Sequence, residues 1–139
     1  MKTMYCVGFL FCGDKVLLIR KEKPEWQKGK LNGVGGKVEK GETARDAMVR
    51  EMKEETGIVT KPSEWTLFCH LEGSDWKVEC FCAASEVPVQ PQILTDEVPS
   101  WFSTNELGKW VIPNLKWLIP MAHCAWDHAE APTVQYNNH

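Results

Sequence analysis

The sequence predicts an α/β (α+β) fold: a mixed sheet with one helix in the middle of the chain and another near the C-terminus. Short apolar runs bounded by turn residues are typical of strands, and they occur on both sides of a long amphipathic segment. A length of 139 residues predicts one domain, residues 1–139, with a sizeable core.

The first forty residues read as strands separated by turns. Residues 4–11 form a continuous apolar run typical of a buried strand, and Gly13-Asp14 is a turn signal before a second strand over residues 15–20. Residues 21–30 are polar and predict a loop. Several glycines in residues 31–38 exclude a helix and favour a short extended segment whose carbonyls can approach a ligand closely.

Residues 43–57 read as one amphipathic helix. Thr43, followed three residues later by Asp46, is a capping-box start, and Gly57 stands where a helix ends in the left-handed conformation. At about 100° per residue one face is an apolar stripe. Its members are Ala44, Ala47, Met48 and Met52.

Acidic side chains interrupt this stripe. Glu51 and Glu55 fall inside it, and Glu54 lies at its edge. Burying an ionised carboxylate without a partner is costly, so a positive group must meet these side chains. Arg50 is one candidate, although it lies well round the helix. A hard divalent cation, which prefers carboxylate and carbonyl oxygens, is the better one.

The second half of the chain begins with two predicted strands, over residues 65–71 and 76–84, joined by a turn at residues 73–75. A proline-containing loop over residues 85–99 follows. A short strand is expected over residues 100–102.

The C-terminal region predicts helices and then a tail. Ser103 with Glu106 has the spacing of another capping box and predicts a brief helix. Residues 113–126 have helical spacing, but Pro120 is expected to kink or shorten that helix. We expect a loose tail from about residue 127.

Composition excludes several classes of protein. A net charge of −3 argues against a nucleic-acid-coating or membrane-surface protein, and we expect no DNA-binding surface. No stretch approaches the roughly 20 apolar residues of a membrane span, and the N-terminus does not resemble a signal peptide. The scattered cysteines are interpreted as reduced core residues of a cytoplasmic protein, with disulfides as the alternative. The oligomeric state, monomer or homodimer, stays open.

One stretch carries glycine, glutamate and arginine at fixed spacing. Gly36 is followed after five residues by Glu42, and after seven more by the run from Arg50 to Ile58, REMKEETGI. Every fixed position of the Nudix box is filled, so the chain resembles the Nudix hydrolase superfamily. The alternative is a salt-laced surface helix. The resemblance is tight from Gly35 to Ile58 and implies an α/β/α sandwich with a mixed central sheet.

The resemblance implies a metal site. Glu51, Glu54 and Glu55 would be metal ligands, and the Gly35 carbonyl would supply a further oxygen. The expected cofactor is Mg²⁺, with Mn²⁺ as a substitute. Such a cluster suits hydrolysis of a phosphoanhydride, and the catalytic residues would include Glu54 and Glu55.

Other positions would support this site. Arg50 and Glu42 look like the family's supporting pair, with the arginine orienting a catalytic glutamate and tying the loop to the helix. Gly36 and Gly57 fill structural positions of the box. A solvated charge is the alternative for Arg50.

Two further charged residues are candidates near the site. Glu97 precedes Trp101-Phe102 at a spacing similar to that of a further glutamate in related nucleotide hydrolases. It is expected to ligate a metal or act as a general base, with an exposed loop acid as the alternative. Lys37 would either meet a phosphate or be solvated.

The branch that includes 8-oxo-dGTP diphosphatases resembles the chain at two asparagines. Asn32 matches a residue that reads the base edge, and Asn114 matches a position that those enzymes fill with Asn or Asp. A helix cap is the alternative for Asn114. Leu115 departs from the pair of adjacent acids in the vertebrate form, which leaves selectivity for 8-oxoguanine open. Trp26 is expected to stack on the nucleobase.

These observations predict Mg²⁺-dependent hydrolysis of a nucleoside triphosphate, such as 8-oxo-dGTP, to a nucleoside monophosphate and pyrophosphate, with a role in nucleotide pool sanitation. One alternative is a hydrolase of another nucleoside diphosphate linked to a group X: ADP-ribose, a dinucleoside polyphosphate or an RNA cap. Residues 70–78 lack the proline or tyrosine that those subfamilies tend to show. A non-catalytic nucleotide sensor is the other alternative, although a sensor would be expected to lose box carboxylates.

Overall fold

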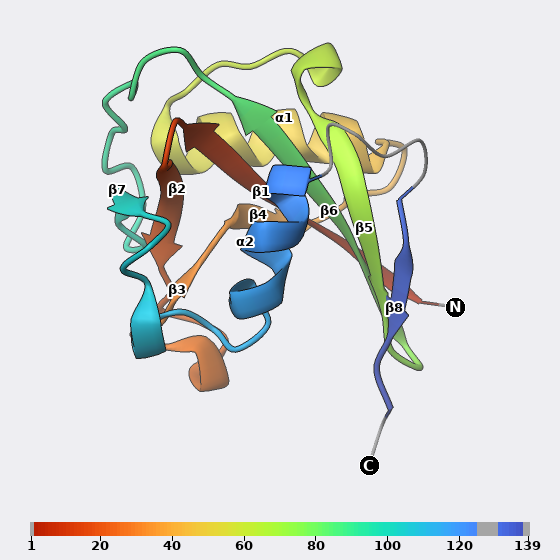
Figure 1. Cartoon of the computed structure of the whole chain (residues 1–139). Helices are drawn as coiled ribbons and strands as arrows, with labels where there is room; N and C mark the ends of the chain where they lie inside the picture. The colour runs from red at the N-terminus through yellow and green to blue at the C-terminus, as the bar shows by residue number, and fades with distance from the viewer. Residues whose placement is uncertain (1, 125–130, 138–139) are drawn as a thin grey trace.

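The computed structural model describes residues 2–124 and 131–137 (Figure 1). The strands within these residues are β1 (Thr3–Cys12), β2 (Lys15–Arg20), β3 (Leu31–Asn32), β4 (Val34–Lys37), β5 (Thr66–Glu72), β6 (Trp76–Ala84), β7 (Pro99–Ser103) and β8 (Thr133–Gln135). They form one sheet in the order β3-β2-β1-β6-β5-β8, while β4 pairs with β1 and β7 with β2. Because β1 is parallel to β6 and antiparallel to β2 and β4, the sheet is mixed, as predicted.

The two helices, α1 (Ala44–Thr56) and α2 (Leu115–Cys124), lie on opposite faces of the sheet (Figure 1). Alternate residues of β1 divide between two cores, as the period of a strand requires. Phe9 packs with α2, whereas Leu10 packs with α1. The predicted α/β/α arrangement is therefore confirmed.

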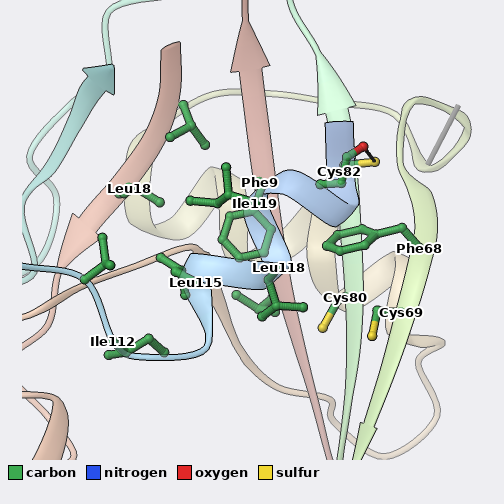
Figure 2. Close-up of a cluster of buried hydrophobic side chains, with 14 of the residues drawn as sticks. Phe9, Leu18, Phe68, Cys69, Cys80, Cys82, Ile112, Leu115, Leu118 and Ile119 are labelled. Carbon is green, nitrogen blue, oxygen red and sulfur yellow. Dashed lines mark hydrogen bonds between the residues drawn. The ribbon is translucent and has the colours of Figure 1, made fainter. Parts of the chain in front are cut away.

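The core beneath α2 is built from aromatic and aliphatic side chains (Figure 2). Phe9 and Phe68 contact each other with ring centroids 6.1 Å apart, and the apolar residues of α2 cover them. The cysteines are free, and Cys6, Cys69, Cys80 and Cys82 are buried among apolar neighbours. Neither α1 nor α2 is long and apolar enough to cross a membrane.

The brief helix predicted at Ser103 is wrong. Ser103 ends β7, and its hydroxyl accepts a hydrogen bond from the Asn105 N–H two residues on, which makes a turn instead of a helix cap. A 3-10 turn, η3 (Gly108–Trp110), follows. Two similar short turns, η1 (Glu25–Gln27) and η2 (Pro62–Glu64), lie in the segments before β3 and β5.

The C-terminal segment also differs from expectation. Helix α2 begins at Leu115 and runs through Pro120 to Cys124. Within the expected loose tail, residues 133–135 form β8, which pairs in parallel with the edge strand β5. The Tyr136 N–H then donates to the Glu72 carbonyl at 2.7 Å. Because β5 would otherwise leave a row of backbone groups unpaired, this edge captures the segment. Residues 127–130, 138 and 139 of the tail lie outside the described residues.

Gly35 allows β4 to lie close to β1. A Cβ at this position would overlap the Cys6 carbonyl oxygen and stand 2.8 Å from the Val7 Cα. These are backbone atoms of a central strand, so they cannot move aside at low cost.

Gly35→Ala is therefore expected to lower the free energy of unfolding by about 2 kcal/mol or more. In Gly36→Ala the nearest neighbour of the new Cβ is the carboxylate end of Glu51, at 2.7 Å, and this flexible side chain can rotate away. Urea denaturation of both variants measures the difference. Equal losses would contradict a backbone clash at Gly35.

Candidate active site

The acidic residues are carried by a well-defined helix. The Thr43 hydroxyl accepts from the Asp46 N–H at 3.0 Å at the start of α1, and Gly57 ends it with φ 76°, as both residue types predict. Ala47, Met48 and Met52 are buried against the sheet. This fixed rotation of the helix determines which carboxylates face inward.

Two of those carboxylates lie over the glycines of β4. The Gly35 N–H donates to Glu55 Oε2 at 3.3 Å. A Cβ on Gly36 would stand within 2.7 Å of Glu51 Oε1. A side chain at Gly36 would thus intrude between strand and helix, whereas one at Gly35 would meet the backbone of β1.

Glu55 is the most perturbed acid of the site. Its side chain is buried, with 8% of the residue exposed. Desolvation, reinforced by the negative charge of Glu51, raises its pKa to about 8, and the Lys21 ammonium opposes this rise only in part. Near neutral pH the carboxyl therefore retains its proton for much of the time.

Arg50 gathers the neighbouring acids. Its Nη2 and Nε bind the two oxygens of Glu42 at 2.7 and 3.2 Å, and Nη2 also donates to the Lys37 carbonyl. Its Nη1 is shared between Glu51 at 2.9 Å and Glu54 at 3.2 Å. The bidentate pair lowers the pKa of Glu42 and ties the loop before α1 to the helix.

Burial raises the pKa of Glu51 despite the Arg50 guanidinium beside it. Glu54 is exposed, so its charge is well solvated. The side chains thus form a gradient, from solvated Glu54 through Glu51 to buried Glu55.

Glu97 is buried near the same acids, contrary to the alternative of an exposed loop acid. It accepts from Lys21 Nζ at 3.1 Å and from the Glu22 N–H at 2.8 Å. Burial acts to raise its pKa, but these hydrogen bonds and the Lys21 charge outweigh burial, so the pKa is lowered. Glu97 and Lys21 both act electrostatically on Glu55, which shows that the structure brings the three together.

Lys21 is a residue that the sequence reading missed. It follows the buried strand β2 directly, and its ammonium is largely shielded from solvent. The signal available in the sequence was the need for a cation to meet the inward-facing carboxylates. No neighbouring residue distinguishes Lys21 from the other lysines of the loop that follows β2.

The donor set fits a hard cation. Glu51, Glu54 and Glu55 are oxygen donors of the kind that Mg²⁺ prefers, and Glu55 lacks a cationic hydrogen-bond partner within the described residues. As placed here, no three acidic, histidine or cysteine side chains of residues 2–124 and 131–137 converge on one point. The physical reason is Arg50, which draws Glu51 and Glu54 toward itself, so a bound cation would compete with its guanidinium.

Asn32 and Lys37 lie on either side of the two glycines of β4 in the sequence. The Asn32 amide is engaged within the chain, since Nδ2 donates to Gln27 Oε1 at 3.1 Å and Oδ1 accepts from the Gly33 N–H. Lys37 ends β4 with an exposed side chain. Each polar atom of the Asn32 amide therefore keeps one further hydrogen-bonding position for a ligand.

A second group of predicted residues lines a cavity of about 650 Å³ at the start of α2. Trp26 is 61% exposed there, and Trp117 and Tyr136 lie in the same lining as Asn114. The Asn114 backbone carbonyl accepts from the Leu118 N–H, but its side chain donates to the Tyr136 hydroxyl at 3.2 Å instead of capping the helix. The contact with Tyr136 was not foreseen, because it joins α2 to the unpredicted strand β8.

Comparison with known proteins identifies the domain. A family model described as "NUDIX domain" matches residues 2–120. An uncharacterized Nudix hydrolase of Bacillus subtilis, YvcI, is 32% identical over 101 residues, which are 68% of this chain and 61% of that protein. The 8-oxo-dGTP diphosphatase of Escherichia coli is 39% identical over 59 residues, covering 42% of this chain and 44% of that protein.

Another relative carries a different activity in its name. The ADP-ribose pyrophosphatase of Methanocaldococcus jannaschii is 44% identical over 54 residues, covering 39% of this chain and 31% of that protein. The chain thus spans less than two thirds of the length of these curated relatives.

Solved structures share the fold. A MutT from a study of Aliivibrio salmonicida and Vibrio cholerae superposes with a TM-score of 0.72 at 22% identity, covering 89% of this chain and 99% of that one. A bifunctional NMN adenylyltransferase/ADP-ribose pyrophosphatase of Francisella tularensis, complexed with AMP and Mn, gives 0.69 at 17% identity, covering 87% of this chain and 41% of that one.

Glu55→Gln should stabilise the metal-free protein at high pH. The folded pKa of about 8 exceeds the ordinary value of 4.5, so the folded state holds a proton that the unfolded state has released. Stability of the parent therefore falls as pH rises above about 4.5, and the loss is complete above about 8. Glutamine does not titrate. In a chelator, we expect the Tm advantage of the variant to grow by about 5 °C or more between pH 5 and 9.

Glu54→Gln is the matched control, because that carboxylate is exposed and its variant should show no such growth. A Tm difference for Glu55→Gln that does not change with pH would contradict the burial of its charge.

Proposed function

The chain belongs to the Nudix domain family, and we propose that it is a divalent-metal-dependent pyrophosphohydrolase that cleaves a nucleoside triphosphate to a nucleoside monophosphate and pyrophosphate. One observation carries this proposal. Glu51 and Glu55 are turned inward over the glycines of β4, where burial raises both of their pKa values. Buried carboxylates of this kind lower the stability of a core, whereas they are useful in a site that binds a cation and an anionic substrate.

The ion would be held by carboxylate oxygens of Glu51, Glu54 and Glu55, with the Gly35 carbonyl and Glu97 as further donors. Mg²⁺ suits these hard ligands, and Mn²⁺ is a substitute. When bound, the ion neutralises charge on the phosphate oxygens and promotes deprotonation of the attacking water.

The remaining residues prepare the site. Arg50 anchors the loop before α1 through Glu42, and its bond to Glu51 is the one that a bound ion would replace. Glu97 has a lowered pKa and is charged near neutral pH, as a general base must be to accept a proton from water. Lys37, exposed at the end of β4, is available to a phosphate oxygen.

We place the nucleobase in the cavity lined by Trp26 and Asn114. The aromatic side chains that line this cavity offer flat faces for stacking, and the volume of the cavity is within the usual range for small-molecule sites. Leu31 of β3 pairs with Val111, and the Ile112 N–H donates to the Leu31 carbonyl, so the cavity wall is tied to the strand that leads to Gly35. Extended chain from Leu31 to Gly35 spans roughly 13 Å. Asn32, between these points, would read the base with the donor and acceptor positions that its amide keeps free.

The relatives differ in the substrate that their names state. The similarity to an 8-oxo-dGTP diphosphatase favours a triphosphate and a role in sanitising the nucleotide pool. The similarity to an ADP-ribose pyrophosphatase favours ADP-ribose as the second candidate. We favour the triphosphate, because residues 70–78 lack the proline or tyrosine expected for the other subfamilies.

A substrate panel with Mg²⁺ tests the proposal. It contains 8-oxo-dGTP, dGTP, dATP, dCTP, ADP-ribose and capped RNA, and the products are measured directly: pyrophosphate and a nucleoside monophosphate from a triphosphate, AMP and ribose 5-phosphate from ADP-ribose, and phosphate-terminated RNA from capped RNA. We expect pyrophosphate from at least one triphosphate and a loss of about 100-fold or more in Glu55→Gln, since a ligand of the cation is removed.

The result separates three activities. Turnover of ADP-ribose alone would replace the triphosphate with the second candidate. Binding across the panel without turnover would identify a nucleotide sensor. Activity of Glu55→Gln within a few-fold of the parent would contradict the carboxylate assignment.

A further inference from the structure

Two side-chain amides meet beside the cavity in which we place the nucleobase. Gln27 directly follows the lining residue Trp26 in η1. Asn32 directly follows Leu31, whose carbonyl accepts from the N–H of Ile112, another lining residue. The two amides are bonded to each other, since Asn32 Nδ2 donates to Gln27 Oε1 at 3.1 Å. The pair therefore lies at the edge of this cavity.

A backbone donor fixes the direction of the pair. Asn32 Oδ1 accepts from the Gly33 N–H at 2.7 Å, and a backbone N–H can only donate. The atom that Asn32 turns toward Gln27 is therefore Nδ2, which also can only donate. The Gln27 atom that accepts from it is Oε1, so Gln27 Nε2 points away from Asn32. Rotating either amide by half a turn would set two donors against each other.

The Nε2 group of Gln27 is open to a ligand. Within residues 2–124 and 131–137 it has no hydrogen-bond partner, and the only buried side-chain nitrogen or oxygen that these residues leave unpaired is Asn114 Oδ1. Nε2 is therefore within reach of solvent. The Gln27 backbone is held in η1, because its N–H donates to the Pro24 carbonyl and its carbonyl accepts from the Lys30 N–H. The outward end of Gln27 thus presents N–H donors from a fixed backbone.

We propose that Gln27 is a specificity-determining residue that favours a nucleobase with a carbonyl oxygen, over one with an amino group, at the edge facing it. The inference rests on the proposed function, which puts the base beside Trp26. Guanine offers the acceptors O6 and N7 on one edge and thymine offers O4, whereas adenine and cytosine carry an amino group at the corresponding position. A carbonyl oxygen accepts from Gln27 Nε2, but an amino group opposes it donor to donor and leaves both groups unpaired.

Equilibrium binding of nucleoside monophosphates tests this inference without requiring hydrolysis. IMP and AMP differ in whether position 6 of the purine carries a carbonyl oxygen or an amino group, and UMP and CMP are the equivalent pyrimidine pair. Calorimetry gives the ratio of Kd values within each pair, in which the contributions of the shared ribose and phosphate cancel. We expect the parent to bind IMP about 5- to 10-fold more tightly than AMP, and UMP more tightly than CMP.

Two substitutions separate the donors of Gln27 from its shape. Gln27→Glu keeps the size of the side chain and an acceptor for Asn32 Nδ2, but it turns an oxygen outward, so AMP should now bind more tightly than IMP. Gln27→Met keeps the length without the donors, so the ratio should fall close to one. Gln90→Glu is the matched control, because it adds the same charge at an exposed residue that does not line the cavity. It should keep the ratio of the parent.

A second measurement follows the amide itself in the ligand-free protein. Asn32→Asp places an acceptor opposite Gln27, so the Gln27 amide should turn Nε2 toward residue 32 and its oxygen outward. In ¹⁵N-labelled protein, the Nε2 protons of Gln27 should then exchange with water about five-fold or more slowly than in the parent, because one of them gains a hydrogen bond. An unchanged exchange rate would overturn the fixed direction of the pair.

Each binding result decides one proposal. A parent that binds neither IMP nor AMP, that does not prefer IMP, or whose preference survives in Gln27→Glu would overturn the role of Gln27, even if triphosphates are hydrolysed. A preference for IMP that reverses in Gln27→Glu, in a protein that hydrolyses nothing, would overturn the proposed function and leave the role of Gln27 standing.

Discussion

The structure depends on one electrostatic constraint: carboxylates on α1 are directed into the protein, toward the two glycines of β4, which have no side chains to cover them. Desolvation makes this costly, and it raises the pKa of Glu55. Two cations pair with the neighbouring acids. Arg50 restrains Glu51 and Glu54, and Lys21 restrains Glu97.

The glycines of β4 and the ends of α1 determine where these carboxylates lie. Gly35 lets β4 lie against β1, and Gly36 lets the Glu51 carboxylate approach the same strand. The caps of α1 fix its start and end, and the buried methionines fix its rotation. Negative charge is thus concentrated beside glycine backbone that carries no side chains. Such a place suits binding of a cation and of the phosphate groups that the cation coordinates.

Most of the fold and the centre of the site follow from local patterns. The strands around the box, the ends of α1 and the inward direction of Glu55 were all predicted, because period and capping depend on neighbouring residues. The helix at Ser103 failed because a hydroxyl can close a turn as readily as it caps a helix. Strand β8, Lys21 and Tyr136 were missed because their partners are distant in the sequence. Strand β8 pairs with the edge strand β5, Lys21 with Glu97, and Tyr136 with Asn114.

A crystal structure with Mn²⁺ and a non-hydrolysable nucleoside triphosphate would test the central constraint most directly, since Mn²⁺ is identified by its anomalous scattering. We expect the ion beside Glu55 and the Gly35 carbonyl, with Glu51 turned from Arg50 toward it and the phosphates on the open side. An ion bound elsewhere, with Glu51 and Glu55 still engaged as in the ligand-free protein, would show that the buried carboxylates serve no metal site.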